Sequence, residues 1–241
     1  MRYGIFSDVH NNLEAFETAL KFYKKERIDK FIFNGDIIGY CANPKECISL
    51  LESLKPVCVV GNHDWAVIGR FDLNYFNNYA KEALLWTRNV LSGQELDYLK
   101  TFVLTYREGD FVCVHGSLES PAEFNYIIHA EDARRNFAQL DKKILFIGHS
   151  HRTESFCLKE DKLSYSKEEM IKIKPKCKYI INEGSIGQPR DRDPRLSVCI
   201  YDSDDKVVKL KRLEYNIKKA ADKILNKGLP NILATRLFQG Q

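Results

Sequence analysis

YGIFSDVH, residues 3–10, is the stretch that decides the fold, because a strand-like apolar run stops there at an aspartate and a histidine. The same pattern recurs four more times, with Asp, Asn or His directly after a short apolar run. The five polar segments are Asp8-Val9-His10, Gly35-Asp36, Gly61-Asn62-His63-Asp64, His115-Gly116 and Gly148-His149-Ser150-His151. Open α/β sheets bind ligands at the carboxyl ends of their strands, so we expect these segments to converge at one edge of a sheet.

Helix-like patterns between these runs indicate an α/β fold. Apolar residues recur at near-helical spacing after the first strand and again over 44–54, which predicts two crossover helices of parallel βαβ units. Capping residues and periodicity predict further helices over 78–90, 92–102, 130–140 and 217–227.

The C-terminal part of the chain has a different pattern. Residues 178–182, 196–201 and 207–215 are rich in β-forming side chains, which predicts a second sheet built from the C-terminal half. Residues 159–176 are polar and poorly periodic, and we expect a surface excursion there. With 241 residues, 44% of them hydrophobic, the chain can bury one full core, and we predict a single domain over 1–241.

Composition indicates the cellular compartment and which kinds of partner to expect. The apolar runs are too short for a transmembrane helix, and Met1 leads into a strand without a signal-peptide region, so we expect a cytoplasmic protein with no membrane partner. Seven cysteines show no zinc-binding spacing, which favours reduced thiols. A net charge of +4 is slight and dispersed, so no dedicated nucleic-acid surface is expected.

The polar segments offer carboxylate, amide and imidazole groups without cysteine. This donor set suits a pair of divalent transition metals better than a structural zinc ion. Five of the six histidines fall inside the segments, and His129, outside them, is assigned no function. Simpler roles compete: Asp8 could cap the following helix, and Asp36 and Asn62 could be turn residues. For Asp64, support of His63 and plain turn capping both remain open.

The ordered series Asp-x-His, Gly-Asp-x-x-Gly, Gly-Asn-His-Asp, His-Gly and Gly-His-Ser-His resembles the calcineurin-like metallophosphoesterase superfamily. GDIIGYCANPKE (35–46) and NEGSIGQPRD (182–191) are similar to a bacterial and archaeal branch of small phosphodiesterase-like proteins. The resemblance implies a four-layer fold, in which two mixed β-sheets pack face to face with helices outside.

The resemblance also implies roles for the polar residues. Asp36 would bridge two divalent ions, which could be Mn, Fe, Ni or Zn, and a metal-bridging hydroxide would attack the phosphorus atom. Asp8, His10 and His151 would complete the shell of one ion, and Asn62, His115 and His149 that of the other. His63 would be the catalytic residue, as general acid or as donor to the transferring phosphoryl group.

One departure bears on the substrate. Protein serine/threonine phosphatases of the superfamily carry an aspartate and an arginine after the Gly-Asp pair, where this chain has Ile37-Ile38-Gly39-Tyr40. We therefore expect a small phosphodiester or nucleotide-like substrate. The alternatives are a dinucleoside polyphosphate hydrolase, a phosphomonoesterase, or a catalytically weak binding or adaptor protein.

A Gly- and Pro-containing segment, 184–195, is predicted to contact the substrate. Arg190 and Arg192 could bind a phosphoryl oxygen bidentately, and Tyr40 could line the pocket wall. The alternative is a solvated loop whose arginines pair with the neighbouring aspartates.

Overall fold

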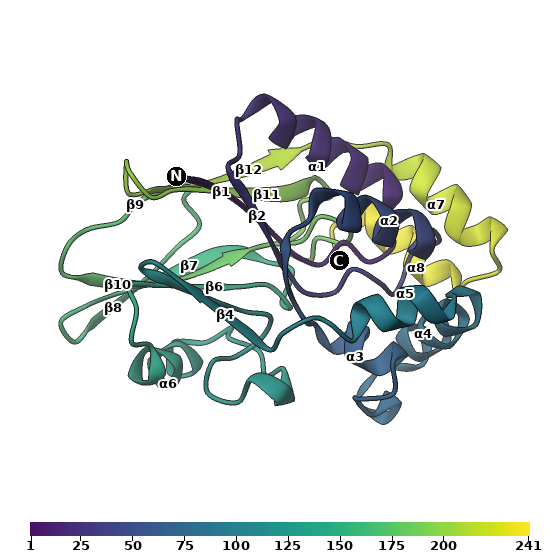
Figure 1. Ribbon diagram of the computed structural model, residues 1–241, viewed down its shortest axis with the longest axis horizontal. Coiled ribbons are helices and arrows are strands. Elements are labelled where there is room, and N and C mark those ends of the chain that lie inside the picture. Colours follow the sequence, from purple (N-terminus) through teal and green to yellow (C-terminus); the bar gives the residue numbers. More distant parts are fainter.

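Two mixed six-stranded sheets pack face to face in the computed structural model, which describes all residues from 1 to 241 (Figure 1). The first sheet has the order β3 (Val57–Val59), β2 (Lys30–Asn34), β1 (Arg2–Phe6), β11 (Leu196–Asp202), β12 (Val207–Leu213) and β9 (Met170–Lys172). The second has the order β4 (Thr105–Glu108), β5 (Phe111–Val114), β6 (Ile144–Ile147), β10 (Cys177–Glu183), β7 (Thr153–Lys159) and β8 (Lys162–Ser166). Strands β1, β2 and β3 are parallel to one another, as are β5, β6 and β10.

Alternation of side chains along each central strand creates the layers. Ile32 points into the core between the sheets, where it joins Phe111 and Phe146 of the second sheet. Its neighbour Phe33 points to the opposite face, where it packs with Phe16 of the first helix. Because successive side chains of a strand face opposite ways, one apolar strand contributes to two cores.

Helices cover both outer faces. Helices α1 (Leu13–Lys25) and α2 (Pro44–Leu54) connect parallel strands as crossovers and pack on the first sheet, and α6 (Ala130–Gln139) packs on the second. The other helices gather beside the carboxyl ends of β1 and β2 (Figure 1). They are α3 (Asn62–Val67), α4 (Asn78–Val90), α5 (Gly93–Leu99), α7 (Ile217–Asn226) and α8 (Asn231–Gln239). This arrangement confirms the four-layer α/β fold.

The structure differs from the expectations about secondary structure and topology at several places. The C-terminal strands do not build a sheet of their own, because β10 joins β6 and β7 while β11 pairs with β1, with Tyr3 opposite Tyr201. The surface excursion at 159–176 contains strand β8 and strand β9, which are edge strands. Helix α8 was not predicted. The five polar segments also follow strands of two facing sheets rather than of one.

None of the helices is both long enough and apolar enough to cross a membrane.

Candidate metal centre

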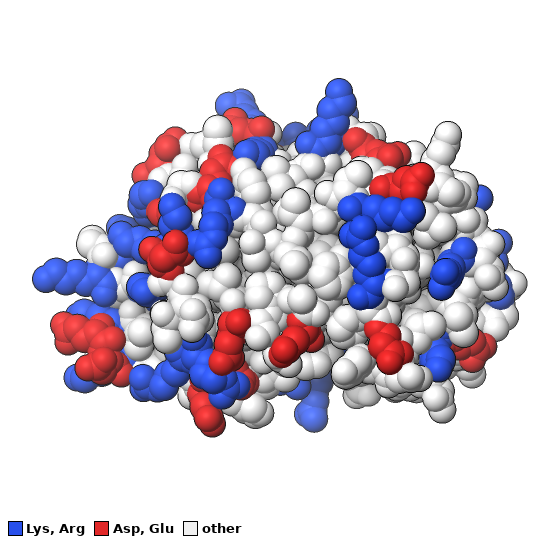
Figure 2. All heavy atoms as spheres, turned by 60° about the horizontal axis from the view of Figure 1, so that its bottom comes forward, with Lys and Arg blue, Asp and Glu red and all other residues white.

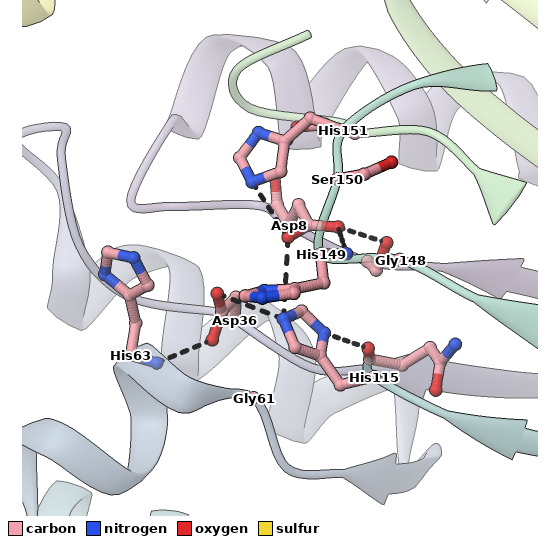
Figure 3. A network of polar contacts seen from close by, with 12 residues as sticks. Asp8, Asp36, Gly61, His63, His115, Gly148, His149, Ser150 and His151 are labelled. Carbon is pink, nitrogen blue, oxygen red and sulfur yellow. Dashed lines mark hydrogen bonds and ion pairs between the residues drawn. The ribbon is translucent and has the colours of Figure 1, made fainter. Parts of the chain in front are cut away.

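All five polar segments meet at one place, where the parallel strands of the two facing sheets have their carboxyl ends (Figure 3). Strands β1, β2 and β3 bring segments from the first sheet, and β5 and β6 bring segments from the second. The structure places together every predicted ligand and the predicted catalytic histidine, all of them buried: Asp8, His10, Asp36, Asn62, His63, His115, His149 and His151. Their roles as ligands remain predictions. The distances between their ligand atoms and their hydrogen bonds support these roles.

The backbone is strained where most of these side chains are presented. Asp8, His10, Asp36, His149 and His151 have φ angles of 54°, 49°, 62°, 63° and 58°. Each such left-handed residue other than glycine costs about 1 kcal/mol or more. Main-chain hydrogen bonds hold the conformation, including Asp8 N–H to the Gly35 carbonyl at 2.9 Å and His10 N–H to the Asp36 carbonyl at 3.1 Å.

One group of metal-binding atoms consists of Asp8, His10 and His151. The Nε2 atoms of the two histidines lie 3.1 Å apart, and His151 Nε2 lies 3.1 Å from Asp8 Oδ1. The three ligand atoms lie within 4.8 Å of one another. These are the three side chains that the sequence assigned to one ion.

The second group consists of Asp36, His115 and His149, whose ligand atoms also lie within 4.8 Å of one another. His115 Nε2 is 3.2 Å from Asp36 Oδ2. The same carboxylate oxygen is 3.7 Å from His10 Nε2 in the first group. Asp36 therefore lies between the groups, where a bridging ligand belongs.

Hydrogen bonds on the far side of the imidazole rings fix which nitrogen faces the centre. The Nδ1 atoms of His10, His115 and His151 lie 2.8, 2.7 and 2.5 Å from the carbonyl oxygens of Ile38, Asn34 and Gln188. A carbonyl oxygen only accepts, so each Nδ1 carries a proton and each Nε2 atom faces inward.

Two imidazole nitrogens at hydrogen-bond distance need a proton or a metal cation between them. His10 Nε2 and His151 Nε2 are in this position, and a carboxylate oxygen accompanies them. Asp8 Oδ1, Asn62 Oδ1 and His115 Nε2 are also buried without a hydrogen-bond partner. Buried polar atoms in native proteins almost always have partners, so the donor set fits divalent metal ions.

Electrostatic effects are large at this centre. Burial alone would raise the pKa of Asp36, but the imidazoles of His115 and His63 hold this pKa well below its ordinary value. Burial lowers the pKa of His149 to about 3, with His115 adding to the effect. Burial also lowers the pKa of His151 to about 3, and here Arg190 adds to the effect. Two of the histidines are therefore neutral at ordinary pH, as metal ligation requires.

His63 lies beside the centre, at the start of α3. Its main-chain N–H donates to Asp36 Oδ1 at 2.9 Å, and its Nε2 lies 3.1 Å from the Tyr40 hydroxyl. Its Nδ1 has no partner, and a side chain on Gly39 would collide with it. The ring also lies within ligand distance of His10 and Asp36, so its geometry is compatible with metal binding as well as with proton donation.

Hydrogen bonds show whether Asp64 and Asp8 act as capping residues. Asp64 accepts hydrogen bonds from the main-chain N–H groups of Asp36, Ile37 and Gly61 at 2.8, 3.0 and 3.0 Å. Asp64 therefore caps the two turns and does not contact the His63 ring. Asn12, rather than Asp8, caps α1, because its side chain accepts from Ala15 N–H.

A pocket of about 270 Å³ opens onto the centre. Tyr40 and Arg190, both predicted to bind substrate, line it. Arg192 does not reach the pocket, which corrects the prediction for this residue. The chain turns away there, with a φ of 68° at Arg192, its N–H bonded to the Gly240 carbonyl and its side chain exposed.

The solvated-loop alternative, in which Arg190, Asp191, Arg192 and Asp193 pair among themselves, is not what the structure shows. Asp193 pairs with Arg195 at 2.7 Å, and Asp191 pairs with Arg212 of β12 where both side chains are largely buried. The segment thus divides after Arg190 into a part that faces the pocket and a part whose aspartates pair with other arginines.

Several pocket residues were missed by sequence reasoning. They are Tyr75, Phe76, Asn77, Tyr79, Ala80, Tyr126 and Arg236. The Tyr126 ring stacks on His149, with centroids 4.0 Å apart and planes at 14°. No local pattern marked Arg236, because its position depends on how α8 packs.

The chain is similar to proteins of one known family. The family model described as the calcineurin-like phosphoesterase superfamily domain matches residues 1–206. An uncharacterized protein of Methanocaldococcus jannaschii, MJ0912, is 38% identical over 99% of this chain and 98% of its own length.

Solved structures resemble the whole chain. A metallophosphoesterase from Sphaerobacter thermophilus is 38% identical and superposes with a TM-score of 0.87, covering 100% of this chain and 99% of that one. The hypothetical protein PH1004 from Pyrococcus horikoshii has a TM-score of 0.82 at 19% identity, covering 100% and 98%, which shows a shared fold alone.

Proposed function

The chain belongs to the calcineurin-like phosphoesterase superfamily, and on that premise we propose that it hydrolyses phosphodiester or nucleotide-like phosphoester bonds at a dinuclear metal site. The observation that carries the proposal is the pair of groups Asp8–His10–His151 and Asp36–His115–His149, with Asp36 between them. Asn62 adds a neutral amide oxygen that has no partner of its own.

We propose that two divalent ions occupy these groups, with Mn, Fe, Ni or Zn as candidates because the ligands mix nitrogen and oxygen. When bound, such ions supply charge neutralisation for phosphoryl oxygens and lower the pKa of water. Asp36 holds the two half-sites at a fixed separation, while the carbonyl-anchored imidazoles keep their Nε2 atoms aimed inward. The chain therefore presents a preorganised site.

His63 is the proposed proton donor or phosphoryl-binding group. Its ring is held on the pocket side of Asp36 by its own N–H bond to that carboxylate. The Tyr40 hydroxyl contacts Nε2, and no carboxylate contacts Nδ1. This arrangement differs from the histidine–aspartate pair of protein phosphatases and supports a substrate other than a phosphoprotein.

The size of the pocket favours a small substrate. A volume of about 270 Å³ is at the low end for small-molecule sites. On the face shown in Figure 2, Lys and Arg alternate with Asp and Glu around an uncharged centre, without a continuous basic track. These features support a small phosphoester as the partner. An adaptor role is disfavoured because all predicted ligands and His63 are present.

The test combines metal analysis with a substrate panel. Metal-replete protein should contain two divalent ions per chain by plasma mass spectrometry. It should hydrolyse bis(4-nitrophenyl) phosphate, a simple diester, with Mn, Fe, Ni or Zn supporting turnover better than Ca. Phosphomonoesters and dinucleotides tested in parallel rank the substrate classes. Fewer than two ions per chain, or no metal-dependent hydrolysis across the panel, contradicts the proposal.

A further inference from the structure

Two arginines from distant parts of the chain meet over the ring of Tyr40. Arg190 Cζ lies 5.5 Å from the ring centroid, and Arg236 Cζ lies 5.9 Å from it. Arg236 Cζ is also 5.8 Å from the centroid of Tyr79. Both arginines line the pocket that contains His63. One tyrosine ring therefore carries two guanidinium groups at the edge of the candidate active site.

Helix α8 delivers Arg236 to this position. Leu233 and Leu237 of the helix are fully buried in a core that also contains Ala80 and Ala83 of α4. The helix ends at Gly240, whose carbonyl accepts the Arg192 N–H at 2.9 Å. The packing of α8 thus fixes where the Arg236 guanidinium can lie. This helix lies outside the residues that the family model matches.

Neither guanidinium is paired with an aspartate or glutamate side chain. The polar partners of Arg190 are Gln188 Oε1 and the Tyr40 hydroxyl. Arg236 Nε donates to the carboxyl oxygen of Gln241, the last residue of the sequence, at 2.6 Å, and both Nη atoms are uncommitted. Arg195 and Arg212 nearby do have aspartate partners.

Two adjacent guanidinium groups without an acidic side chain between them are unfavourable in a partly buried pocket. Burial and the charge of Arg190 lower the pKa of Arg236, which reflects this cost. The one acid that lines the pocket, Asp36, is already engaged by His115 and by the His63 N–H. An anion bound between the arginines would offset the repulsion.

The arginines lie close to both His63 and the metal-binding groups. Arg190 Nη2 is 3.1 Å from the Tyr40 hydroxyl, which is 3.1 Å from His63 Nε2. The Tyr40 ring also packs against His10, with centroids 4.6 Å apart, and the Arg190 N–H donates to the His151 carbonyl at 3.1 Å. A phosphate held by the arginines would therefore lie next to the phosphoester at the metal-binding groups.

We propose that Arg190, Arg236 and Tyr40 form a subsite for a second phosphate group of the substrate. The proposal rests on the proposed function, because it defines the second group relative to the bond that is cleaved. It names the substrate class as phosphoesters with two or more phosphates, such as nucleoside or dinucleoside polyphosphates, in preference to simple diesters. Arg236 is then the residue that determines this specificity.

The test compares Arg236→Gln and Arg190→Gln with Arg192→Gln, which removes an exposed guanidinium close by in the same segment. Binding of methylenediphosphonate to metal-free protein is measured first, by calorimetry or by ³¹P NMR titration. The two pocket variants should weaken binding about tenfold or more, since hydrogen bonds to a charged oxygen are lost. Arg192→Gln should bind like the wild type. Arg236→Lys should recover part of the loss, because it keeps the charge without the fork.

Kinetics of the metal-loaded protein form the second arm. Arg236→Gln should raise the KM for diadenosine tetraphosphate at least about tenfold more than the KM for bis(4-nitrophenyl) phosphate. Circular dichroism and the thermal midpoint of each variant verify that it is folded.

The two arms separate the subsite from the chemistry. Arg236-dependent binding of the diphosphonate without any phosphoester hydrolysis supports the subsite and contradicts the proposed function. Metal-dependent hydrolysis in which both KM values respond equally to Arg236→Gln overturns the subsite and leaves the function standing. Equal diphosphonate binding by wild type, Arg236→Gln and Arg190→Gln also overturns the subsite.

Discussion

The two ends of the paired sheets use acidic residues in opposite ways. At the end opposite the metal centre, Glu108 contacts Lys30 at 2.6 Å and Tyr3 at 3.0 Å, while Asp110 contacts Lys206 at 3.0 Å. At the candidate metal centre, Asp8 and Asp36 are buried and face imidazoles, the Ser7 hydroxyl and main-chain N–H groups, but no lysine. Charge is balanced by lysine side chains at the first end. At the candidate metal centre, the proposed metal ions would complete the balance.

The largest expected effect comes from Asp36→Asn. The change weakens the one side chain shared by both groups, so the metal content should fall below two ions per chain and the rate should fall about 100-fold or more. Plasma mass spectrometry and diester hydrolysis measure the two effects. Asp110→Asn makes the same chemical change at the balanced end, and this control should keep both ions and the rate. If Asp36→Asn and Asp110→Asn both lost metal, the proposed difference between the two ends of the sheets would be wrong.

His63→Ala should affect rate alone. Loss of proton donation or of phosphoryl stabilisation lowers the rate by about 100-fold or more, while both metal ions stay bound. His129→Ala is the matched control, because His129 is exposed and lies outside the centre. If His63→Ala protein loses metal along with its activity, His63 is a ligand and the proposed division of roles is wrong.

Glu183→Gln tests the metal-centre end of the sheets through the pH dependence of the free energy of unfolding. Glu183 is buried on β10, with one oxygen bonded to Asn34 Nδ2 at 2.8 Å and the other without a partner. Burial raises the pKa of Glu183 well above 4.5, although the Asn34 hydrogen bond opposes the shift. The folded state therefore keeps its proton at a pH where the unfolded state has lost it. Stability should decline as pH rises above 4.5, by at most about 1.4 kcal/mol per pH unit from this group.

In Glu183→Gln protein this decline should disappear. Urea unfolding from pH 5 to pH 8 gives the free energy of unfolding for both proteins. The variant should gain stability relative to the wild type as pH rises. Parallel pH profiles would show that Glu183 is ionised in the folded state and has a partner that balances its charge.

The smallest effect should come from Glu108→Gln, at the end of the sheets opposite the metal centre. The stability that Glu108 contributes should change with pH in the opposite direction to that of Glu183. Burial alone would raise the pKa of Glu108, but Lys30 and Tyr106 lower it below its ordinary value. The stability from this carboxylate is present above the unfolded pKa and is lost as pH falls through the folded one. Because the pair is partly exposed, the cost near pH 7 should be about 1 kcal/mol or less by urea unfolding. A larger loss, or any loss of metal, would contradict this assignment.

Sequence patterns predicted those parts of the structure that local order determines. Strand ends such as Asp8 and His149 could be located because an apolar run stops abruptly at a polar residue. The sheet to which a strand belongs could not be predicted in the same way. Strands β10 and β11 look alike in sequence, yet they join different sheets because pairing depends on contacts with residues far away in the chain.

Solvent exposure and the path of the backbone explain other differences between prediction and structure. Strand β8, with the sequence KLSYS, is mostly exposed and carries little apolar alternation, so its pattern resembled a loop. Arg190 and Arg192 are two residues apart in one segment, but only Arg190 faces the pocket. The sequence supplied the residue type, and the path of the backbone decided which arginine could reach the site.

The pairing of β1 with β11 has a consequence for the order of events during synthesis. Tyr3 lies opposite Tyr201 in this antiparallel pair, so nearly two hundred residues must emerge from the ribosome before β1 gains its second neighbour. Until then one edge of β1 has unpaired main-chain groups that could pair with another chain. Asp8 and His10 follow this strand directly, and His151 binds the carbonyl of Gln188. We therefore expect the proposed metal ions to bind late in folding, after the first sheet has closed.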